Sequence, residues 1–420
     1  MKTKPLVISI IGSYYLKNRG DELLLKGTIK LFQLLFTDRT VKFNIYLMKP
    51  DEEACFFSNE ERRNLHIFSS VITFIEPMRR SLYLLAWSCL YRIFPSNQLL
   101  ALLPRNDRKK VLALLQSDFI VFRSIDQISD IFSSNLFLNS YIQATFGYNL
   151  KKQQFLLHSQ TIFFTRNHNL LVKLAMKFSI ILLSKEVNIT LRDKFSEEWF
   201  VENKVRYFSI IPPPSIIMTP EIKGKHYTKE KQKPKKILIF PRIRFLESGD
   251  YIELVEGLIS KYPTSEIFLA GQSCITEAND DDYVVISNIL HRINANQVNR
   301  IKVFDITNKS LLDILKFIMD FDCVVSLRAI MAVSALSSGI PTIMVDPYGG
   351  KNIGLAKLFG FEKFACSIES FNPSLVIGWI EDILENEEQY HKFLQGKSEE
   401  LYNEVQTETR RLIQASCEHQ

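Results

Sequence analysis

The sequence lacks the residue patterns of a metal site and of a membrane span. Its six cysteines and seven histidines are scattered along 420 residues, with no C-x-x-C and no H-x-x-x-H pair. Because zinc needs ligands close together, no metal site is expected. No run of eighteen apolar residues occurs, so the sequence predicts no transmembrane helix. The apolar run after Met1 is short and has no small-residue cleavage site, so we interpret it as a strand and not as a signal peptide. We therefore expect a protein of the reducing cytoplasm.

A large excess of one charge is also missing. Lys and Arg number 52 against 46 Asp and Glu, a net charge of +6, and hydrophobic residues make up 46% of the chain. This composition excludes a disordered or collagen-like protein, and at roughly 100–200 residues per domain the length indicates two domains. The stretch 221–236 holds seven Lys and two Glu. The rest is close to neutral, so no nucleic-acid partner is expected.

Apolar, β-branched runs alternate with helical patterns along the whole chain. The run at 5–12 is followed by a helical pattern to about Phe36, and a second strand pattern lies at 41–48. This β–α–β order indicates parallel strands with crossover helices. The same alternation resumes at 236–240. The sequence therefore predicts an α/β protein with two doubly wound, Rossmann-like parallel-sheet lobes.

A proline- and lysine-rich stretch separates the two series. Pro212–Pro214 and the lysines after it favour an extended, solvated segment. Ligands of doubly wound sheets bind beyond the carboxyl ends of the strands, so we expect the site in a cleft between the lobes. The predicted division is an N-terminal lobe at 1–215, a linker at 216–236, a C-terminal lobe at 237–383, and a helical tail at 384–420 that packs back across the first lobe.

The loop after the first strand is a candidate anion site. Gly12 ends the strand, and Asn18, Gly20 and Asp21 open the next helix, where free backbone amides favour an anion. The alternative is turn chemistry, in which Gly20 bends the chain and Asp21 caps the helix.

Two arginines immediately follow strand patterns. Arg192 follows 187–191, and Arg328 follows 322–326, which ends in Ser326. A guanidinium at this place can bind a carboxylate or phosphate through two hydrogen bonds. The alternative for each arginine is an ion pair with a nearby aspartate: Asp193 for Arg192, and Asp322 or Asp346 for Arg328.

Further candidates lie at other strand ends. Tyr348 and Lys351 follow the strand at 340–345, so Lys351 and Arg328 lie at the carboxyl ends of adjacent strands and favour an anion pocket. His158 ends the strand at 154–157, where it is either an acid in the cleft or a hydrogen-bonded structural histidine.

Two apolar segments are candidates for contact with a membrane surface. Residues 79–94 carry Tyr, Trp and Phe behind the Arg79–Arg80 pair, and residues 170–183 contain only two lysines. The alternative is that both are core-facing helices. The first is the better candidate, because basic flanks and aromatic rings are typical of helices that lie in a membrane surface.

The order and spacing of these motifs resemble the polysaccharide pyruvyl transferase family from residue 6 to about residue 360. The sequence departs from the family pattern at Ile330, which replaces a histidine two places after the arginine, at the glycine-rich turn (123–126), and at Pro212–Pro214. The matching motifs are Gly12, Asn18–Glu22, Asp118–Val121, Ser159–Gln160, Ile189–Ser196, Asp322–Arg328, Gly339, Pro341, Tyr348 and Lys351.

The resemblance implies transfer of a pyruvyl group from phosphoenolpyruvate, a co-substrate needing no further cofactor. The acceptor would be a sugar of a cell-surface polysaccharide or its lipid-linked precursor, which would bring the enzyme to the inner face of the membrane. It also implies a fold like that of glycosyltransferase B enzymes. Open alternatives are a two-lobed glycosyltransferase that uses a nucleotide sugar, and a non-catalytic protein that binds a glycan precursor. The residues expected to act are Arg328, Arg192, His158 and Asp21, with substrate contacts from Gly12, Asn18, Gly20, Ser326, Tyr348 and Lys351.

Overall fold

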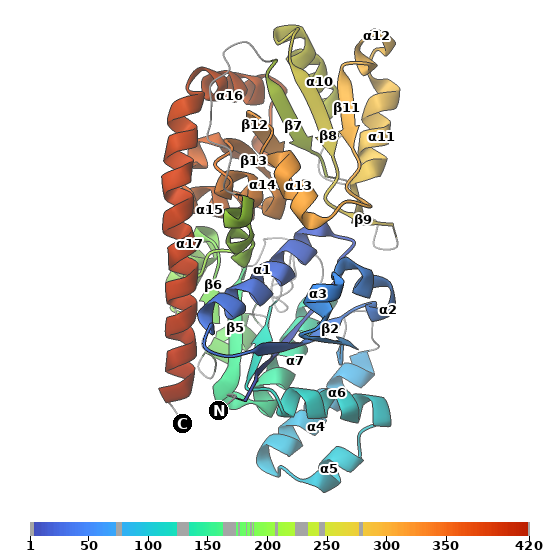
Figure 1. The fold of residues 1–420 in the computed structure, drawn as a ribbon, viewed down its shortest axis with the longest axis vertical. Coiled ribbons are helices and arrows are strands. Elements are labelled where there is room, and N and C mark those ends of the chain that lie inside the picture. The colour runs from blue at the N-terminus through green and yellow to red at the C-terminus, as the bar shows by residue number, and fades with distance from the viewer. Residues whose placement is uncertain are drawn as a thin grey trace. The chain divides into compact units, whose positions relative to one another are not determined.

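A computed structural model describes most of the chain, and Figure 1 shows it as a ribbon. Two compact units are formed. Unit 1 comprises Met1–Tyr15, Ile29–Pro212 and Glu404–Gln420, and unit 2 comprises Leu16–Thr28 and Pro213–Asn403. The described residues are 4–72, 78–123, 134–162, 174, 177–181, 183–184, 187, 189–205, 209–222, 234–242, 248–276 and 280–418.

Unit 1 is built on a six-stranded sheet in which every neighbouring pair is parallel. The strand order is β3-β2-β1-β4-β5-β6. Strands β4 and β5 are buried along their whole length, as expected for a parallel sheet covered on both faces. The strands are β1 (Leu6–Tyr14), β2 (Val41–Leu47), β3 (Leu65–Ser69), β4 (Phe119–Phe122), β5 (Phe155–Gln160) and β6 (Ile189–Leu191).

The helices α3, α5 and α9 of unit 1 begin at polar caps that the local sequence supplies. Ser58 and Glu61 form a reciprocal capping box, Ser96 caps α5, and Asp193 caps α9. The elements are α1 (Arg19–Leu35), whose first half belongs to unit 2, α2 (Pro50–Glu53), η1 (Ala54–Phe56), α3 (Asn59–Arg62), α4 (Met78–Ile93), α5 (Asn97–Ala101), α6 (Arg105–Leu115), α7 (Ser134–Leu150), η2 (Lys152–Gln154) and α9 (Lys194–Glu202).

Unit 2 repeats this plan. Its six parallel strands follow the order β11-β8-β7-β12-β13-β14, beside a short antiparallel pair of β9 and β10. The sequence did not indicate that pair. The strands are β7 (Lys236–Phe240), β8 (Glu266–Ala270), β9 (Cys274–Ile275), β10 (Asp280–Asp281), β11 (Ile301–Phe304), β12 (Cys323–Ser326), β13 (Thr342–Asp346) and β14 (Ala365–Ser367).

The helices of unit 2 end in one long C-terminal helix. The 32 residues of α17 bury Leu394, Leu401, Val405 and Leu412, which share one helical face. The elements are η3 (Pro214–Ile222), α10 (Ser248–Lys261), α11 (Asp282–Arg292), α12 (Ala295–Val298), α13 (Leu311–Ile318), α14 (Ala329–Ser337), α15 (Lys351–Leu358), η4 (Glu362–Phe364), η5 (Ile368–Ser370), α16 (Pro373–Glu385) and α17 (Glu387–Glu418).

The prediction of two doubly wound parallel sheets is confirmed. The boundaries differ from the expected ones. Residues 16–28 belong to unit 2, and the expected linker starts within that unit, because the apolar Ile216 and Ile217 are buried where η3 packs on α14. The tail is divided, with Glu404–Gln420 in unit 1. The remaining predicted linker at 223–233 and most of the segment 170–183 lie outside the described residues.

Within the described ranges, no helix combines the length and the apolar character that a membrane crossing requires.

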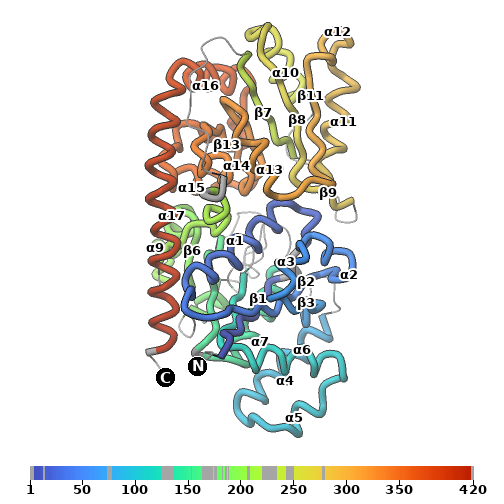
Figure 2. Tube along the Cα trace, viewed as in Figure 1, coloured from blue at the N-terminus to red at the C-terminus, as the bar shows by residue number. Residues whose placement is uncertain are grey.

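Each sheet has one point at which the strand order reverses. In unit 1 the chain leaves β1 toward β2 and β3 and returns to the other side at β4; in unit 2 it leaves β7 toward β8 and β11 and returns at β12. Figure 2 follows this path along the Cα trace. Side chains at the carboxyl ends of such strands face the place where doubly wound sheets bind ligands.

Candidate functional site

The carboxyl edge of the unit 2 sheet gathers charged residues around its reversal point. Arg242 lies two residues beyond β7 and Arg328 two residues beyond β12, so the two arginines flank the reversal directly. The loop after β8 contributes Gln272, the loop after β13 contributes Tyr348, and the start of α15 contributes Lys351. Four adjacent parallel strands therefore supply this site.

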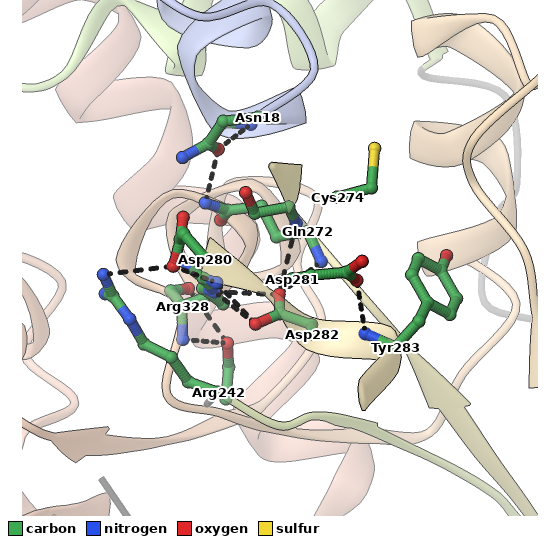
Figure 3. Close-up of polar contacts among 12 residues, drawn as sticks. Asn18, Arg242, Gln272, Cys274, Asp280, Asp281, Asp282, Tyr283 and Arg328 are labelled. Carbon is green, nitrogen blue, oxygen red and sulfur yellow. Dashed lines mark hydrogen bonds and ion pairs between the residues drawn. The ribbon is translucent and has the colours of Figure 1, made fainter. Parts of the chain in front are cut away.

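Arg328 is buried and joined to two carboxylates, as Figure 3 shows. Its Nε donates to Asp282 Oδ2 at 2.9 Å, and its Nη2 donates to Asp280 Oδ1 at 2.7 Å. A further bond joins Nη1 to Asp280 Oδ2 at 3.2 Å. Burial opposes the charged form, but Asp282 and Asp280 outweigh it and raise the pKa of Arg328 above its ordinary value.

The two expected partners of Arg328 are bound elsewhere. Asp322 accepts a hydrogen bond from the backbone N–H of Lys236 at 2.6 Å. Asp346 accepts from the backbone N–H groups of Tyr348 at 2.6 Å and Gly350 at 3.0 Å, and it also holds the start of α15. Arg328 is thus an ion-paired arginine, but with aspartates that follow β9 in the chain.

Backbone amides hold one of the two carboxylates that pair with Arg328. Asp282, the first residue of α11, accepts from the amides of Gln272 at 2.9 Å and Ser273 at 3.2 Å. Burial alone would raise the pKa of Asp280, but the charges of Arg328 and Arg242 lower it to about 2. Asp280 is therefore ionised at neutral pH, and its side chain keeps 23% of its surface exposed.

Tyr348 lies against two further cations. The guanidinium carbon of Arg242 is 4.8 Å from the centre of its ring, and Lys351 Nζ is 5.9 Å from it. Arg242 Nη2 also lies 3.8 Å from Asp280 Oδ1. Burial and the nearby Arg328 lower the pKa of Arg242. Cation–π contact thus links the β7 and β13 ends of the site.

The first turn of α14 lies at the centre of this edge. Ser326 stabilises the backbone turn that leads into α14. The Ser326 hydroxyl accepts a hydrogen bond from the Arg328 N–H at 3.0 Å and donates one to the Arg328 carbonyl at 2.9 Å. Within the part of the chain that the structure describes, no side chain caps this helix. Its first-turn amides are therefore suited to an anion. Ile330, in the same turn, is buried.

The Asn18–Asp21 segment belongs to unit 2 and not to the N-terminal lobe. Asn18 Oδ1 accepts from Gln272 Nε2 at 2.8 Å and from the Gly20 N–H at 3.0 Å (Figure 3). A Cβ at Gly20 would lie 2.7 Å from Gln272 Nε2, so a larger residue here would require the Gln272 side chain to shift. The segment docks the start of α1 onto the loop after β8.

Asp21 does not cap α1, because the helix already begins at Arg19. Its N–H donates to the Asn18 carbonyl at 2.9 Å, and its side chain is buried in the first turn, where a negative charge suits the helix dipole. The neighbouring Glu22 pairs with Arg19 at 2.8 Å and Lys26 at 3.2 Å. Asn18 supplies the turn chemistry that the sequence assigned to Asp21.

In unit 1, Gly12 lies at the reversal point and lets β1 and the end of β4 approach. The Arg123 N–H donates to the Ile11 carbonyl at 2.8 Å. Gly12 has a φ of +140°, and a Cβ there would lie 1.8 Å from the Arg123 carbonyl oxygen. Its role in this structure is to permit close backbone contact.

Arg192 is buried at the carboxyl end of β6. Its Nε donates to Thr161 Oγ1 at 2.5 Å, and Thr161 donates to Asp193 Oδ2 at 2.7 Å. Asp193 also accepts from the Ser196 N–H at 2.8 Å, and burial raises its pKa. Thr161 thus links Arg192 to Asp193. Arg192 belongs to unit 1 and Arg328 to unit 2.

His158 is fully buried in unit 1, which does not suit a proton donor. Its Nε2 lies 3.0 Å from Thr409 Oγ1, and the Phe32 ring is 6.3 Å away. Burial, helped by the charge of Arg123, lowers its pKa to about 3. The ring is therefore neutral at physiological pH, which supports the structural interpretation of this residue over an acid in a cleft.

The buried His158 predicts a loss of stability in acid. Between pH values of about 6.5 and 3 the unfolded chain binds a proton at this residue that the folded chain does not, so the free energy of unfolding falls as the pH falls. When the pH is lowered from about 7 to about 5, the free energy of unfolding of His158→Gln should fall by roughly 2 kcal/mol less than that of the natural protein. Urea unfolding at both pH values measures this. The exposed His291→Gln should behave like the natural protein.

The structure divides the predicted site residues between the units. Unit 2 holds Asn18, Gly20, Asp21, Ser326, Arg328, Tyr348 and Lys351, and unit 1 holds Gly12, His158 and Arg192.

Sequence reasoning missed Arg242, Gln272, Asp280 and Asp282. The run of three aspartates at 280–282 and the arginine just beyond a strand were available signals. In the ranges that the structure covers, no cluster of three or more histidines, cysteines or acidic residues could hold a metal ion.

Comparison with known proteins adds evidence on the fold. No protein-family model and no curated protein matches the chain. Among solved structures, a glycosyltransferase from Rickettsia africae is 12% identical, with a TM-score of 0.57 over 100% of both chains. S. aureus MnaA with UDP gives 0.54 at 11% identity, covering 94% of this chain and 91% of that one. The UDP-GlcNAc 2-epimerase from Neisseria meningitidis, bound to UDP-GlcNAc, gives 0.51 at 10% identity, covering 93% and 94%.

These similarities establish the class of fold. The chain has two parallel-sheet α/β units of six strands each and the glycosyltransferase B type of architecture. Such a fold hosts several activities, so the function has to be argued from the site.

Proposed function

We propose that the protein is a transferase that uses a nucleotide-activated sugar as its donor, bound by unit 2. The observation that carries this proposal is the first turn of α14, which lies at the reversal point of the sheet with Arg328 as its N-cap residue. The amides of a helix N-terminus, together with nearby cations, suit the diphosphate of a nucleotide sugar. Two of the solved structures with this fold hold UDP or UDP-GlcNAc.

The residues of the site divide into positioning and binding roles. Arg328 is held by Asp280 and Asp282, so it fixes β10 and the start of α11 against the start of α14. Arg242 and Lys351, beside Tyr348, are the cations proposed to stabilise the charge that develops on the leaving diphosphate. Asp280, ionised and partly exposed, is suited to accept hydrogen bonds from hydroxyl groups of the sugar or ribose.

Lys351→Ala should weaken nucleotide binding by about 10- to 100-fold, because one charge-assisted contact is worth roughly 1.5–3 kcal/mol. Calorimetric titration of the full chain with UDP and with UDP-GlcNAc measures the effect. Lys357→Ala is the matched control, since Lys357 lies on the same helix and is exposed. Unchanged affinity in Lys351→Ala, or no nucleotide binding by the natural protein, would contradict the proposed donor site.

Pyruvyl transfer from phosphoenolpyruvate to a sugar is the second candidate. The ordered motifs from Gly12 to Lys351 favour it, whereas the pairing of Arg328 with two carboxylates leaves that guanidinium poorly placed for a small dianion. Titration with phosphoenolpyruvate, with Arg328→Ala as control, separates the two candidates. Binding of phosphoenolpyruvate without binding of UDP would select pyruvyl transfer, and tight binding of a ligand without turnover would select a non-catalytic glycan-precursor protein.

The acceptor proposed for either reaction is a glycan, either a cell-surface polysaccharide or its lipid-linked precursor. The proposed place of action is the cytoplasm, where free thiols persist. All six cysteines are free in the structure.

A further inference from the structure

Helix α4 of unit 1 is apolar on its exposed side as well as on the side that buries Leu84 and Trp87. Its serines Ser81 and Ser88 are buried, whereas Leu82, Leu90 and Ile93 are about half exposed or more. A surface helix ordinarily turns its apolar stripe to the core and its polar residues to water. The exposed face of α4 therefore has the character of a buried one.

The exposed face is continuous, and the chain carries no charged residue between Arg80 and Arg92. At 100° per residue its members fall within roughly 140° of one another around the helix axis. Leu102, at the end of α5, extends it. Its members on and just beyond α4 are Leu82, Tyr83, Ala86, Cys89, Leu90, Ile93 and Phe94. We refer to these residues with Leu102 as the α4 face.

Specific contacts fix α4 in this orientation. Asn149 Nδ2 of α7 donates to Ser88 Oγ at 3.0 Å, and Trp87 Nε1 donates to the Leu99 carbonyl at 2.9 Å. At the far end, the Arg92 guanidinium lies 4.7 Å from the centre of the Tyr148 ring. A rotation that buried the apolar face would break these contacts and bury charged flanks. The exposure is thus built into the packing of unit 1.

Basic residues lie on both sides of the α4 face along the chain. The segment 78–110 carries seven Lys or Arg and one Asp, a net charge of +6, so the other residues, with 45 basic and 45 acidic side chains, are neutral overall. Arg79, Arg92, Arg105 and Lys109 are exposed. Figure 1 shows α4 and α5 at one edge of unit 1, with α6 and α7 between them and the sheet.

We infer that the α4 face binds the surface of an anionic phospholipid membrane. The apolar side chains enter the boundary between headgroups and acyl chains, and the basic residues contact lipid phosphates. The positive charge near the α4 face favours a lipid surface over a second copy of the chain as the binding partner. A second copy of the chain would bring the same +6 segment against itself, whereas an anionic lipid surface neutralises it. The inference goes beyond the donor chemistry and would place a lipid-linked acceptor beside unit 1.

The test uses the full chain and sedimentation with phosphatidylcholine vesicles, with and without phosphatidylglycerol. The natural protein should sediment with the anionic vesicles only, and high salt should release much of it. Leu90→Ser with Ile93→Ser should lower the bound fraction about tenfold. The matched control is Val201→Ser with Leu375→Ser, since these side chains are 61% and 43% exposed against 50% and 65% for Leu90 and Ile93. This control should bind like the natural protein.

A second variant, Arg105→Glu with Lys109→Glu, changes only exposed basic side chains and should also lower the bound fraction. Equal recovery of the natural protein in the supernatant with both vesicle types would overturn the inference. So would a self-association of the natural protein, seen by sedimentation velocity, that the Leu90/Ile93 variant loses. Nucleotide titration should be unchanged in all these variants, so that failure of the donor proposal and failure of membrane binding are told apart.

Discussion

Arg328→Ala is expected to lower the free energy of unfolding by about 3–5 kcal/mol, because it removes one partner of a buried ion pair. Asp282 is fully buried and Asp280 is partly exposed, and both accept hydrogen bonds from this guanidinium. Without it, two carboxylates are left close together in a medium that disfavours charge. Chemical denaturation monitored by circular dichroism measures the change.

Companion variants identify the cause of that loss. Arg328→Lys keeps the charge but cannot donate to both carboxylates in the same geometry, so an intermediate loss is expected. In the background of Arg328→Ala, Asp282→Asn should cost much less than it does alone, giving a coupling energy of about 2 kcal/mol or more. Arg292→Ala, on the exposed side of α11, should stay within about 0.5 kcal/mol of the natural protein. Additive losses for Arg328 and Asp282 would show that the pair does not act as a unit.

Gly12→Ala is expected to destabilise unit 1 by about 3 kcal/mol or more, from backbone strain and a backbone clash together. The φ of +140° is rarely adopted by residues with a side chain, and the new Cβ would lie 1.8 Å from the Arg123 carbonyl oxygen. Relief requires β1 to separate from the end of β4, which breaks the bond between the Arg123 N–H and the Ile11 carbonyl. Denaturant unfolding with a probe in unit 1 measures the loss.

Gly378→Ala is the control for this substitution. Gly378 lies inside α16, and a Cβ there meets nothing within 4 Å. Alanine should therefore stabilise that helix, by up to about 1 kcal/mol. Similar small effects at both glycines would mean that the close contact at Gly12 is not required for folding.

The strand-end arginines illustrate what the sequence could and could not predict about the candidate site. The placement of Arg328 just beyond a buried strand follows from a run of apolar residues ending in Ser326, which is a local pattern. Its partners Asp280 and Asp282 lie 46 to 48 residues earlier in the chain, and no periodicity connects them. The ion-pair alternative drawn from the sequence named Asp322 and Asp346 instead, which are nearer along the chain but are bound by backbone amides.

The sequence by itself determined the two parallel sheets, because alternating strand and helix patterns leave few ways to connect buried strands. Only the tertiary structure decided that Asn18 bonds with Gln272, 254 residues away, and that His158 is too buried to hold a proton. The same holds for α4, whose composition is apolar on several sides and whose packing on α7 selects which side faces water. The physical reason is the distance along the chain over which each effect acts. Hydrophobic periodicity is set by neighbouring residues, whereas desolvation and ion pairing depend on groups that folding brings together.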